Sequence, residues 1–155
     1  MDEILIILRG IINDLSEPYE YTDERLQRLV CINAVLLLRE LTFQTAYTIN
    51  LQNNTITPFP LYSSPFTALV SLKTACMIAS GEHKDAAKKS IYIKDGPGSI
   101  DTKEMAIQLG RTSKTVCDAY EEAKLNYQYG DGSAGQLIVG PYSNGISCER
   151  KVPYS

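Results

Sequence analysis

Histidine and tryptophan are the scarcest residues in this 155-residue sequence, which has one histidine and no tryptophan. His83 stands in the charged stretch "GEHKDAAKK" at positions 81–89, where we expect it to be solvated. A lone histidine in such a stretch gives no basis for a Ser-His-Asp or Cys-His catalytic set. The cysteines are too far apart for a C-x-x-C zinc pattern. We therefore expect no enzyme activity, no cofactor and no metal.

The sequence also lacks an excess of basic residues and a long apolar run. Its formal net charge is −3, which argues against a chain that binds nucleic acid through its overall charge. The start "MDEILIILRGIINDL" carries acids before the apolar residues, and Arg9 interrupts them, unlike a secretory signal. It is too short to cross a bilayer, so we expect an amphipathic helix and no membrane partner.

Four cysteines are present, and the first three fall in helical patterns beside apolar neighbours. Cys31, Cys76 and Cys117 are predicted to be small core residues, and Cys148 belongs to the C-terminal tail. Because thiols stay reduced in the cytosol, we expect all four to be reduced and dispensable.

Hydrophobic spacing predicts two helices before position 45. The first ends near Leu15, and Pro18 breaks the connection that follows. Thr22 is a suitable N-cap for the second helix, which extends to about Phe43 and is apolar around most of its circumference. Such a helix is expected at the centre of the domain.

A β-hairpin is predicted at about 46–58. Tyr47, Ile49 and Leu51 alternate with polar residues, Asn53-Asn54 supplies a turn, and 55–57 resumes the extended pattern. This ribbon has no larger sheet of its own to join, so we expect its apolar residues, Ile56 included, to pack on another subunit.

Ser64-Pro65 predicts the start of a third helix, which we expect to stop at Gly81 or to continue for a turn or two beyond it. "SIYIKD" (90–95) has the alternation of a short strand, and "GPGS" then leads into a fourth helix from Thr102 towards Tyr129. Its spacing does not match a nucleotide-binding glycine loop, and Asp101 would repel a phosphate. The segment is therefore interpreted as a connector.

These elements predict a mostly α fold: a helical bundle with a β-hairpin excursion and an extended C-terminal tail. The helical domain covers 1–129 and the tail covers 130–155. The tail is rich in glycine and serine but keeps many apolar side chains, and "QLIVG" has the character of a strand that adds to a partner's sheet. We interpret it as a docking element, with Arg150 and Lys151 setting register by charge pairing.

One segment suggests a different class of protein. "AIQLGRTSKTV" (106–116) has the spacing of a helix-turn-helix, with Gly110 in the turn and 111–115 facing a DNA groove. A DNA-binding regulator that uses 102–121 is therefore the alternative interpretation. The acidic residues Asp118, Glu121 and Glu122 that follow weaken it, because phosphate attraction supplies much of DNA affinity.

The order of elements resembles the head-to-tail adaptor (connector) proteins of tailed bacteriophages. The resemblance covers about 1–129 and rests on the amphipathic start, "YTDERLQRLVCINAVLLLREL", the excursion ending "TITPFP", "SPFTALVSLKTACMIASGE" and "IYIKDGPGSID". It implies a helical subunit of a ring, usually a dodecamer, that joins the portal to the tail in the neck of the virion.

That resemblance also implies the partners and the location. They are the portal protein, tail or nozzle proteins and identical subunits, with genomic DNA passing through the channel without specific binding. The protein would be made in the host cytoplasm and reside in the virion. The residues expected to contact portal or a neighbouring subunit are Tyr47, Ile49, Leu51, Ile56, Leu137, Ile138, Val139, Tyr142, Ile146, Arg150 and Lys151.

Overall fold

The computed structural model describes residues 2–60, 63–92 and 102–130. Within these ranges the chain forms four helices and one two-stranded antiparallel hairpin, which confirms the predicted mostly α fold. The elements are α1 (Asp2–Ile12), α2 (Asp23–Glu40), β1 (Thr48–Asn50), β2 (Thr55–Thr57), α3 (Pro65–Tyr92) and α4 (Thr102–Tyr129).

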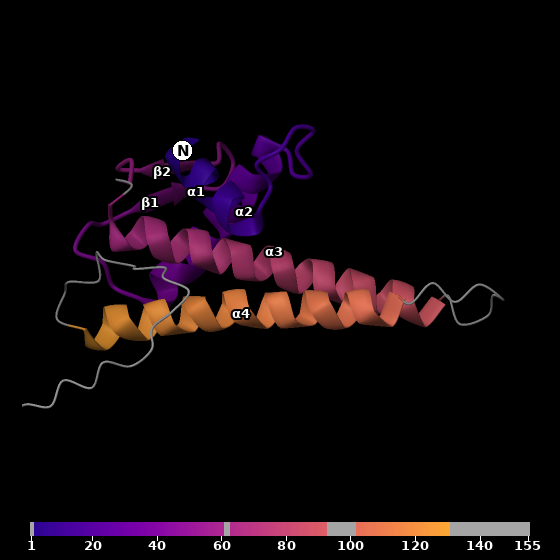
Figure 1. Ribbon diagram of the computed structural model, residues 1–155. Helices are drawn as coiled ribbons and strands as arrows, with labels where there is room; N and C mark the ends of the chain where they lie inside the picture. The colour runs from indigo at the N-terminus through magenta and orange to yellow at the C-terminus, as the bar shows by residue number, and fades with distance from the viewer. Residues whose placement is uncertain (1, 61–62, 93–101, 131–155) are drawn as a thin grey trace, which may run out of the picture.

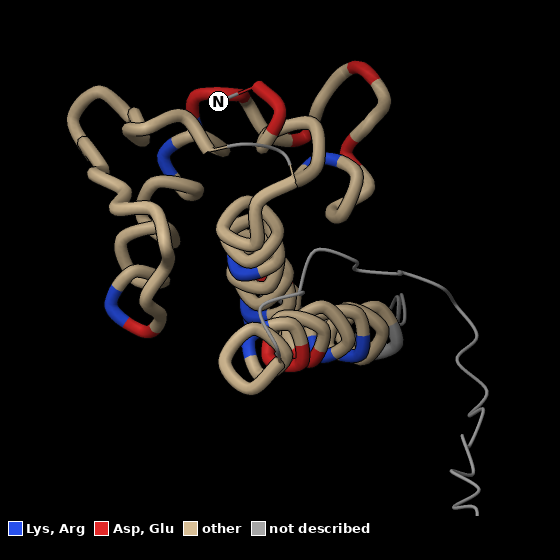
Figure 2. The backbone as a smooth tube through the Cα atoms, turned by 90° about the vertical axis from the view of Figure 1, so that its left-hand side faces the viewer, with Lys and Arg blue, Asp and Glu red and all other residues tan. Residues whose placement is uncertain are grey.

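Two long helices, α3 and α4, run side by side in opposite directions over their 28 residues each (Figure 1). Helices α1 and α2 pack on α3, and β1 of the hairpin packs on α2 (Figures 1 and 2). The end of α2 also reaches α4, through Glu40. The end of the α3–α4 pair where α3 ends and α4 begins extends past these elements. We call that end the arm tip.

Side-chain caps begin two of the helices as the sequence predicts. Thr22 Oγ1 accepts a hydrogen bond of 3.4 Å from the backbone N–H of Arg25. Ser64 Oγ accepts one of 3.2 Å from the N–H of Thr67, and Pro65 occupies the first position of α3. Each cap satisfies a backbone donor that the first turn of a helix leaves unpaired.

The core lies between α1, α2 and the first half of α3, where apolar side chains at helical spacing face each other. Its most deeply buried members include Ile4, Leu8, Leu26, Val30, Leu37, Phe66 and Val70. Helix α4 contributes less to this core, because only Tyr120 of its described residues is a buried hydrophobic. The N-terminal elements and α3 therefore form the main folded body.

Of the two predicted ends of the third helix, the stop at Gly81 is wrong and the continuation beyond it is confirmed, because α3 extends to Tyr92. Gly81 does not adopt the left-handed conformation by which glycine ends a helix. The cost of glycine in a helix, about 1 kcal/mol, is offset here by the packing of α3 on α4. The strand predicted at 90–95 is helical at 90–92, and its remaining residues lie outside the described ranges, as do the connector 96–100 and Asp101.

The first two helices end earlier than expected, at Ile12 and Glu40 instead of near Leu15 and Phe43. Leu41 is already extended, with φ −132° and ψ 145°. The hairpin is confirmed, with Ile49 opposite Ile56. Its turn is held by Asn50 Oδ1, which accepts hydrogen bonds from the N–H groups of Gln52 and Asn53.

Candidate interaction surfaces

The hairpin packs on the helices of its own chain. Ile56 is buried, with 7% of its surface exposed, and Tyr47 and Ile49 are half-buried against the same core. Leu51, at the turn, is 51% exposed. The expectation that the hairpin lacks a packing partner within the subunit is therefore wrong, and Ile56 is not available to a neighbour. Leu51 remains free to make such a contact.

Four aromatic rings connect the hairpin to the rest of the body. Tyr47 stacks on Phe66 at 4.0 Å between centroids, and Phe43 stacks on Tyr127 at 5.0 Å. Phe43 also meets Phe66 edge-on at 5.2 Å. These rings line a groove of about 610 Å³ between the segment after α2, the start of α3 and the end of α4. No pattern in the sequence predicts this arrangement, because the four residues come from three segments: the connection between α2 and β1, the start of α3 and the end of α4.

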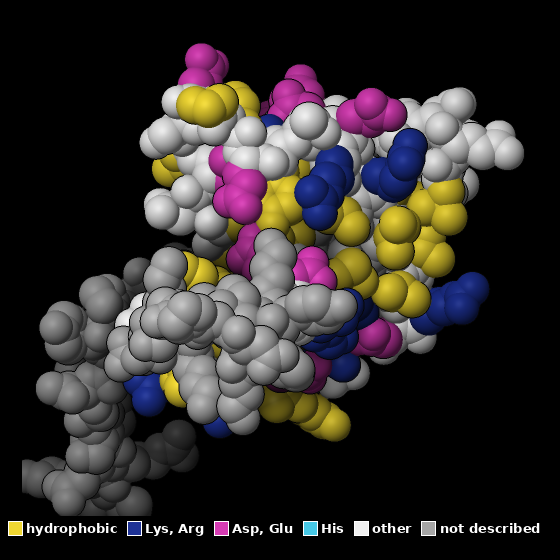
Figure 3. Space-filling view, turned by 90° about the vertical axis from the view of Figure 1, so that its right-hand side faces the viewer, with side chains coloured by type: hydrophobic (Ala, Val, Ile, Leu, Met, Phe, Trp, Pro, Cys, Tyr) yellow, Lys and Arg dark blue, Asp and Glu magenta, His cyan; other side chains and the backbone are white. Residues whose placement is uncertain are grey.

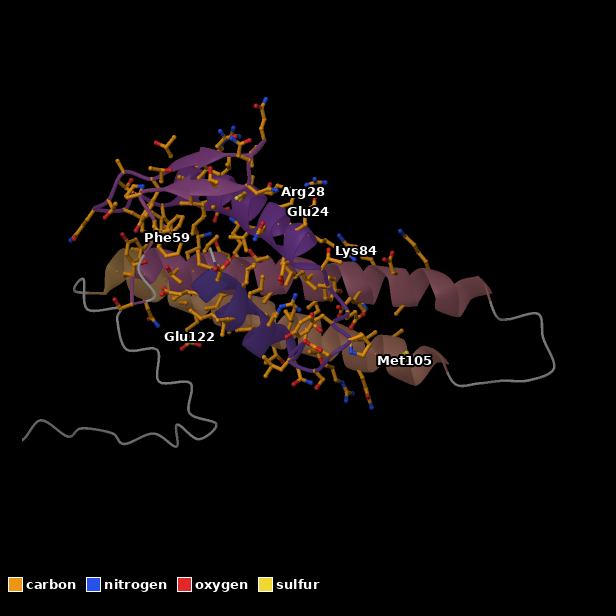
Figure 4. All side chains as sticks on the ribbon, turned by 90° about the horizontal axis from the view of Figure 1, so that it is seen from above. Glu24, Arg28, Phe59, Lys84, Met105 and Glu122 are labelled. Carbon is orange, nitrogen blue, oxygen red and sulfur yellow. A yellow bond between two sulfur atoms is a disulfide. The ribbon has the colours of Figure 1, made fainter. Side chains whose placement is uncertain are left out.

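Two large apolar side chains are exposed at opposite ends of the molecule. Phe59, just after β2, is 54% exposed, and Met105, near the arm tip, is 64% exposed. Figure 4 shows them far apart, with Phe59 beside the hairpin and Met105 near the start of α4. Figure 3, seen from the side of the arm tip, shows hydrophobic groups on the body, bordered by charged ones. They are two of several exposed large hydrophobic side chains among the described residues, which also include Ile6, Leu15 and Tyr129.

A charged cluster centred on Glu40 connects α2, α3 and α4. Its carboxylate pairs with Lys73 of α3 and with Lys124 of α4, the latter at 3.1 Å. Tyr120 Oη donates a further hydrogen bond of 2.9 Å to Glu40 Oε2. Lys73 and Lys124 also lie over the Tyr120 ring, at 5.4 and 5.7 Å from its centroid. The cluster fixes how α4 sits against the body.

The environment of Glu40 acts on its pKa in two directions. Partial burial raises the pKa, but the hydrogen bonds from Lys73, Lys124 and Tyr120 outweigh it and lower the pKa to about 2. For Tyr120, burial and the bond to the Glu40 carboxylate both raise the pKa. Glu40 is therefore ionised and Tyr120 protonated at neutral pH, which suits a structural ion-pair network.

Cys76 and Cys117 form a disulfide, so the prediction that all cysteines are reduced is wrong for this pair. The antiparallel packing of α3 on α4 brings their Cα atoms to 4.8 Å, although 41 residues separate them. Both are half-buried, whereas Cys31 is a free, buried thiol whose pKa is raised by burial, as expected of a core residue. Cys148 lies outside the described ranges.

Arg9 forms a second buried network that sequence reasoning missed. Its guanidinium donates to Asp14 at 2.5 Å, to the Tyr21 carbonyl at 2.8 Å and to Asp23 at 2.6 Å. Asp14 in turn accepts from the N–H of Glu20 at 2.9 Å. These bonds tie α1 to the start of α2. The available signal was an arginine inside an apolar helix, which needs such partners when it is buried.

The segment 111–115 lies in the middle of α4, which is continuous through Gly110, so the predicted turn of a helix-turn-helix is wrong. A Cβ on Gly110 would lie 2.9 Å from His83 Nε2 of α3, which shows how closely the two helices approach there. His83 is accordingly half-buried and not fully solvated as expected. Arg111 and Lys114 are exposed, and Ser113 is buried, 3.1 Å from Ser80 between the hydroxyl oxygens.

The remaining predicted contact residues, Leu137, Ile138, Val139, Tyr142, Ile146, Arg150 and Lys151, lie outside the described ranges, as does the predicted tail from 131 onward. In the part of the chain that the structure describes, His, Cys, Asp and Glu side chains form no group able to hold a metal ion. No helix in that part is long and apolar enough to span a membrane.

Comparison of the chain with protein-family models, with curated protein sequences and with solved structures finds no match.

Proposed function

We propose that this chain is a structural virion protein, a head-to-tail adaptor whose copies form a ring that joins the portal to the tail and surrounds the DNA channel. The observation that carries this proposal is the pair of separate apolar contact points at Phe59 and Met105. A subunit with two different apolar contact surfaces can bind its neighbours head to tail. Such heterologous contacts form a closed ring when the rotation between successive copies brings the last copy back to the first.

The shape of the subunit supports the same proposal. The body carries the hairpin, and the arm tip extends away from the body at the other end of α3 and α4 (Figure 1). In a ring, the Met105 surface of one subunit would reach the Phe59 surface of the next. Leu51, which is exposed at the hairpin turn, would add to the contact.

Portal and tail proteins are the proposed further partners. The tail from 130 would dock on portal through its apolar residues, with Arg150 and Lys151 pairing with acidic groups. Genomic DNA would pass through the ring without specific binding, which suits a chain with a net charge of −3. The protein would be made in the host cytoplasm and act in the neck of the virion.

Two single variants test the ring contact. Phe59→Asp and Met105→Asp each remove one contact point, so neither protein alone should form rings with portal in negative-stain electron microscopy. In an equimolar mixture, the intact Met105 surface of the Phe59→Asp variant can bind the intact Phe59 surface of the Met105→Asp variant. This should give pairs and no rings, because each pair has no further intact contact surface. Gln108→Asp, which adds the same charge at an exposed polar position of α4, is the matched control and should assemble normally.

The portal protein of the same phage provides the decisive reagent. Co-purification of the wild-type chain with portal, and a ring on the portal in micrographs, are the expected results. A chain that neither binds portal nor forms a ring would contradict the proposal. Assembly that is unaffected by both Phe59→Asp and Met105→Asp would leave the adaptor function possible but exclude this ring contact.

A further inference from the structure

One side of α4 carries six exposed residues whose positions alternate in steps of four and three. They are Ile107, Arg111, Lys114, Asp118, Glu121 and Leu125, which we call the α4 stripe. Steps of this kind keep residues on one side of a helix, as in the contact seam of a coiled coil. The α3-facing side of α4 is different and includes Ser113, Val116 and Tyr120.

The charges of the α4 stripe follow a specific order. From the N-terminal end it reads apolar, basic, basic, acidic, acidic, apolar. Figure 2 shows charged residues of both signs along this helix. When a second copy of the stripe runs in the opposite direction, 107 lies opposite 125, 111 opposite 121, and 114 opposite 118. Each apolar residue then faces an apolar one, and each basic residue faces an acidic one.

We propose that the α4 stripe binds the same stripe of a second copy of this chain, with the two α4 helices antiparallel. Ile107 lies against the partner's Leu125, Arg111 pairs with the partner's Glu121, and Lys114 pairs with the partner's Asp118. The two-fold axis passes between the two helices at the level of position 116, on the stripe side of α4 between Lys114 and Asp118, and every contact occurs twice. A parallel pairing in register would place like charges opposite each other, so charge selects the antiparallel arrangement.

The stripe is available for this contact. Ile107 and Leu125 are each about half exposed, although both are large apolar residues. Among the ion pairs of the described residues, none involves Arg111, Lys114 or Asp118. Glu121 makes one pair of 3.7 Å with Lys124, whose side chain is mostly buried and also pairs with Glu40. The charges are therefore free to pair with a second copy without breaking a buried network.

The contact is small and reversible. Ile107 and Leu125 are separated by about 27 Å along the helix, so the interface is one helix wide and at the low end of specific interfaces. Exposed ion pairs contribute at most about 1 kcal/mol each and weaken in salt. Dissociation should therefore increase with ionic strength, and the apolar ends should provide the salt-independent part of the affinity.

This contact does not rest on the adaptor function. A two-fold contact closes after two copies, whereas a ring needs a contact that repeats around an axis, here proposed at Phe59 and Met105. The α4 stripe uses neither residue, so each contact can fail without the other.

Charge variants of the full-length chain test the stripe in sedimentation experiments over a concentration series at low salt. Arg111→Glu with Lys114→Glu makes the stripe acidic, and Asp118→Lys with Glu121→Lys makes it basic. Each variant alone should remain monomeric, and an equimolar mixture should form heterodimers. Lys84→Glu with Lys88→Glu, the same charge change on exposed positions of α3, is the matched control and should dimerise as the wild type does.

Cross-linking tests the direction and register in a Cys148→Ser background. A mixture of the Ile107→Cys and Leu125→Cys variants should give a disulfide-linked heterodimer, while either variant alone should cross-link much less. A wild-type chain that stays monomeric throughout the concentration series would overturn the proposal. So would dimers or larger assemblies in which 107 and 125 do not cross-link preferentially, or an acidic variant that dimerises like the wild type.

Discussion

Tyr120 of α4 donates a hydrogen bond of 2.9 Å to Glu40 at the end of α2, across 80 residues of sequence. The same carboxylate pairs with Lys73 and Lys124, so one side chain collects contacts from both long helices. Removing it would leave two lysines and a buried phenol without their partner. Leaving such groups without a charged partner lowers the free energy of unfolding.

Replacing Glu40 should therefore destabilise the protein, more so at neutral than at acidic pH. Glu40→Gln should lower the free energy of unfolding by about 1–2 kcal/mol at pH 7, the lower part of the range for charged hydrogen bonds, because Glu40 is partly solvated. Its pKa is depressed to about 2 from 4.5 when folded, so its contribution is present above pH 4.5 and is lost as the pH falls towards 2. Urea unfolding at several pH values measures this.

The control for Glu40 is Glu24→Gln. Glu24 pairs with Arg28 at 3.6 Å, but both side chains are largely exposed, so the change should have little effect. Equal losses in the two variants, or a loss in Glu40→Gln that persists unchanged below pH 3, would contradict the role of the cluster.

The disulfide between Cys76 and Cys117 should stabilise the attachment of α4 to α3. Closing a loop with a sequence separation of 41 contributes about 4 kcal/mol in the chain-entropy model, so Cys117→Ser should lower the melting temperature markedly. Reduction of the wild-type protein should have the same effect and should not affect the variant. Mass spectrometry of the unreduced protein checks the pairing.

Cys148→Ser provides the matched control for the disulfide, and we expect it to preserve both stability and assembly. Two free thiols at 76 and 117 in protein purified without reductant would show that the cross-link does not form.

The sequence was sufficient to predict the helices and the hairpin because their signals are local. Thr22, Ser64 and Pro65 mark helix starts through the backbone groups they satisfy, and Asn53-Asn54 marks the turn. The boundary at Gly81 failed because the packing of α3 on α4 overrides a weak local preference.

The contact surfaces were harder to predict, since they depend on which helices lie together. Nothing in the spacing of Cys76 and Cys117, or of Glu40, Lys73 and Lys124, shows that they meet. The hairpin residues were identified correctly as apolar, but the pattern does not tell whether Ile56 faces its own helices or another chain. Only the packing of the hairpin on the core distinguishes the two.

Two hairpin residues should therefore behave differently. Ile56→Ala should lower the free energy of unfolding by about 2–4 kcal/mol, because it empties a buried site. Leu51→Ala should leave stability almost unchanged and should weaken assembly with portal, since Leu51 is exposed. Chemical denaturation and a portal pull-down measure the two effects. A stable Ile56→Ala protein that fails to assemble would instead support a contact of Ile56 with a neighbouring subunit.

Two glycines within the long helices, Gly81 and Gly110, test whether α3 and α4 continue without a break through these positions. Gly81→Ala should stabilise the protein by about 1 kcal/mol, because an added Cβ there meets nothing within 4 Å. Gly110→Ala should stabilise less, since its Cβ would lie 2.9 Å from His83 Nε2, and adding His83→Ala should restore the gain. Thermal melts measure all three. Destabilisation by Gly81→Ala would indicate that the helix ends there.

The C-terminal tail should be dispensable for folding and necessary for docking. The described core reaches Tyr127, and truncation after Tyr129 removes one described backbone hydrogen bond, from the N–H of Gly130 to the Asn126 carbonyl at 2.8 Å. The truncated protein should therefore keep the melting temperature and circular dichroism of the full chain.

The apolar residues of the tail, such as Leu137, Ile138 and Val139, are more numerous than a linker needs, and a strand of this character can add to an exposed sheet edge. The truncated protein should accordingly lose binding in a pull-down with portal. A variant of full length with Leu137→Ser, Ile138→Ser and Val139→Ser separates the apolar contact from the mere length of the tail, and it should also lose binding. Full portal binding by the truncated protein would place the docking surface within residues 1–129 instead.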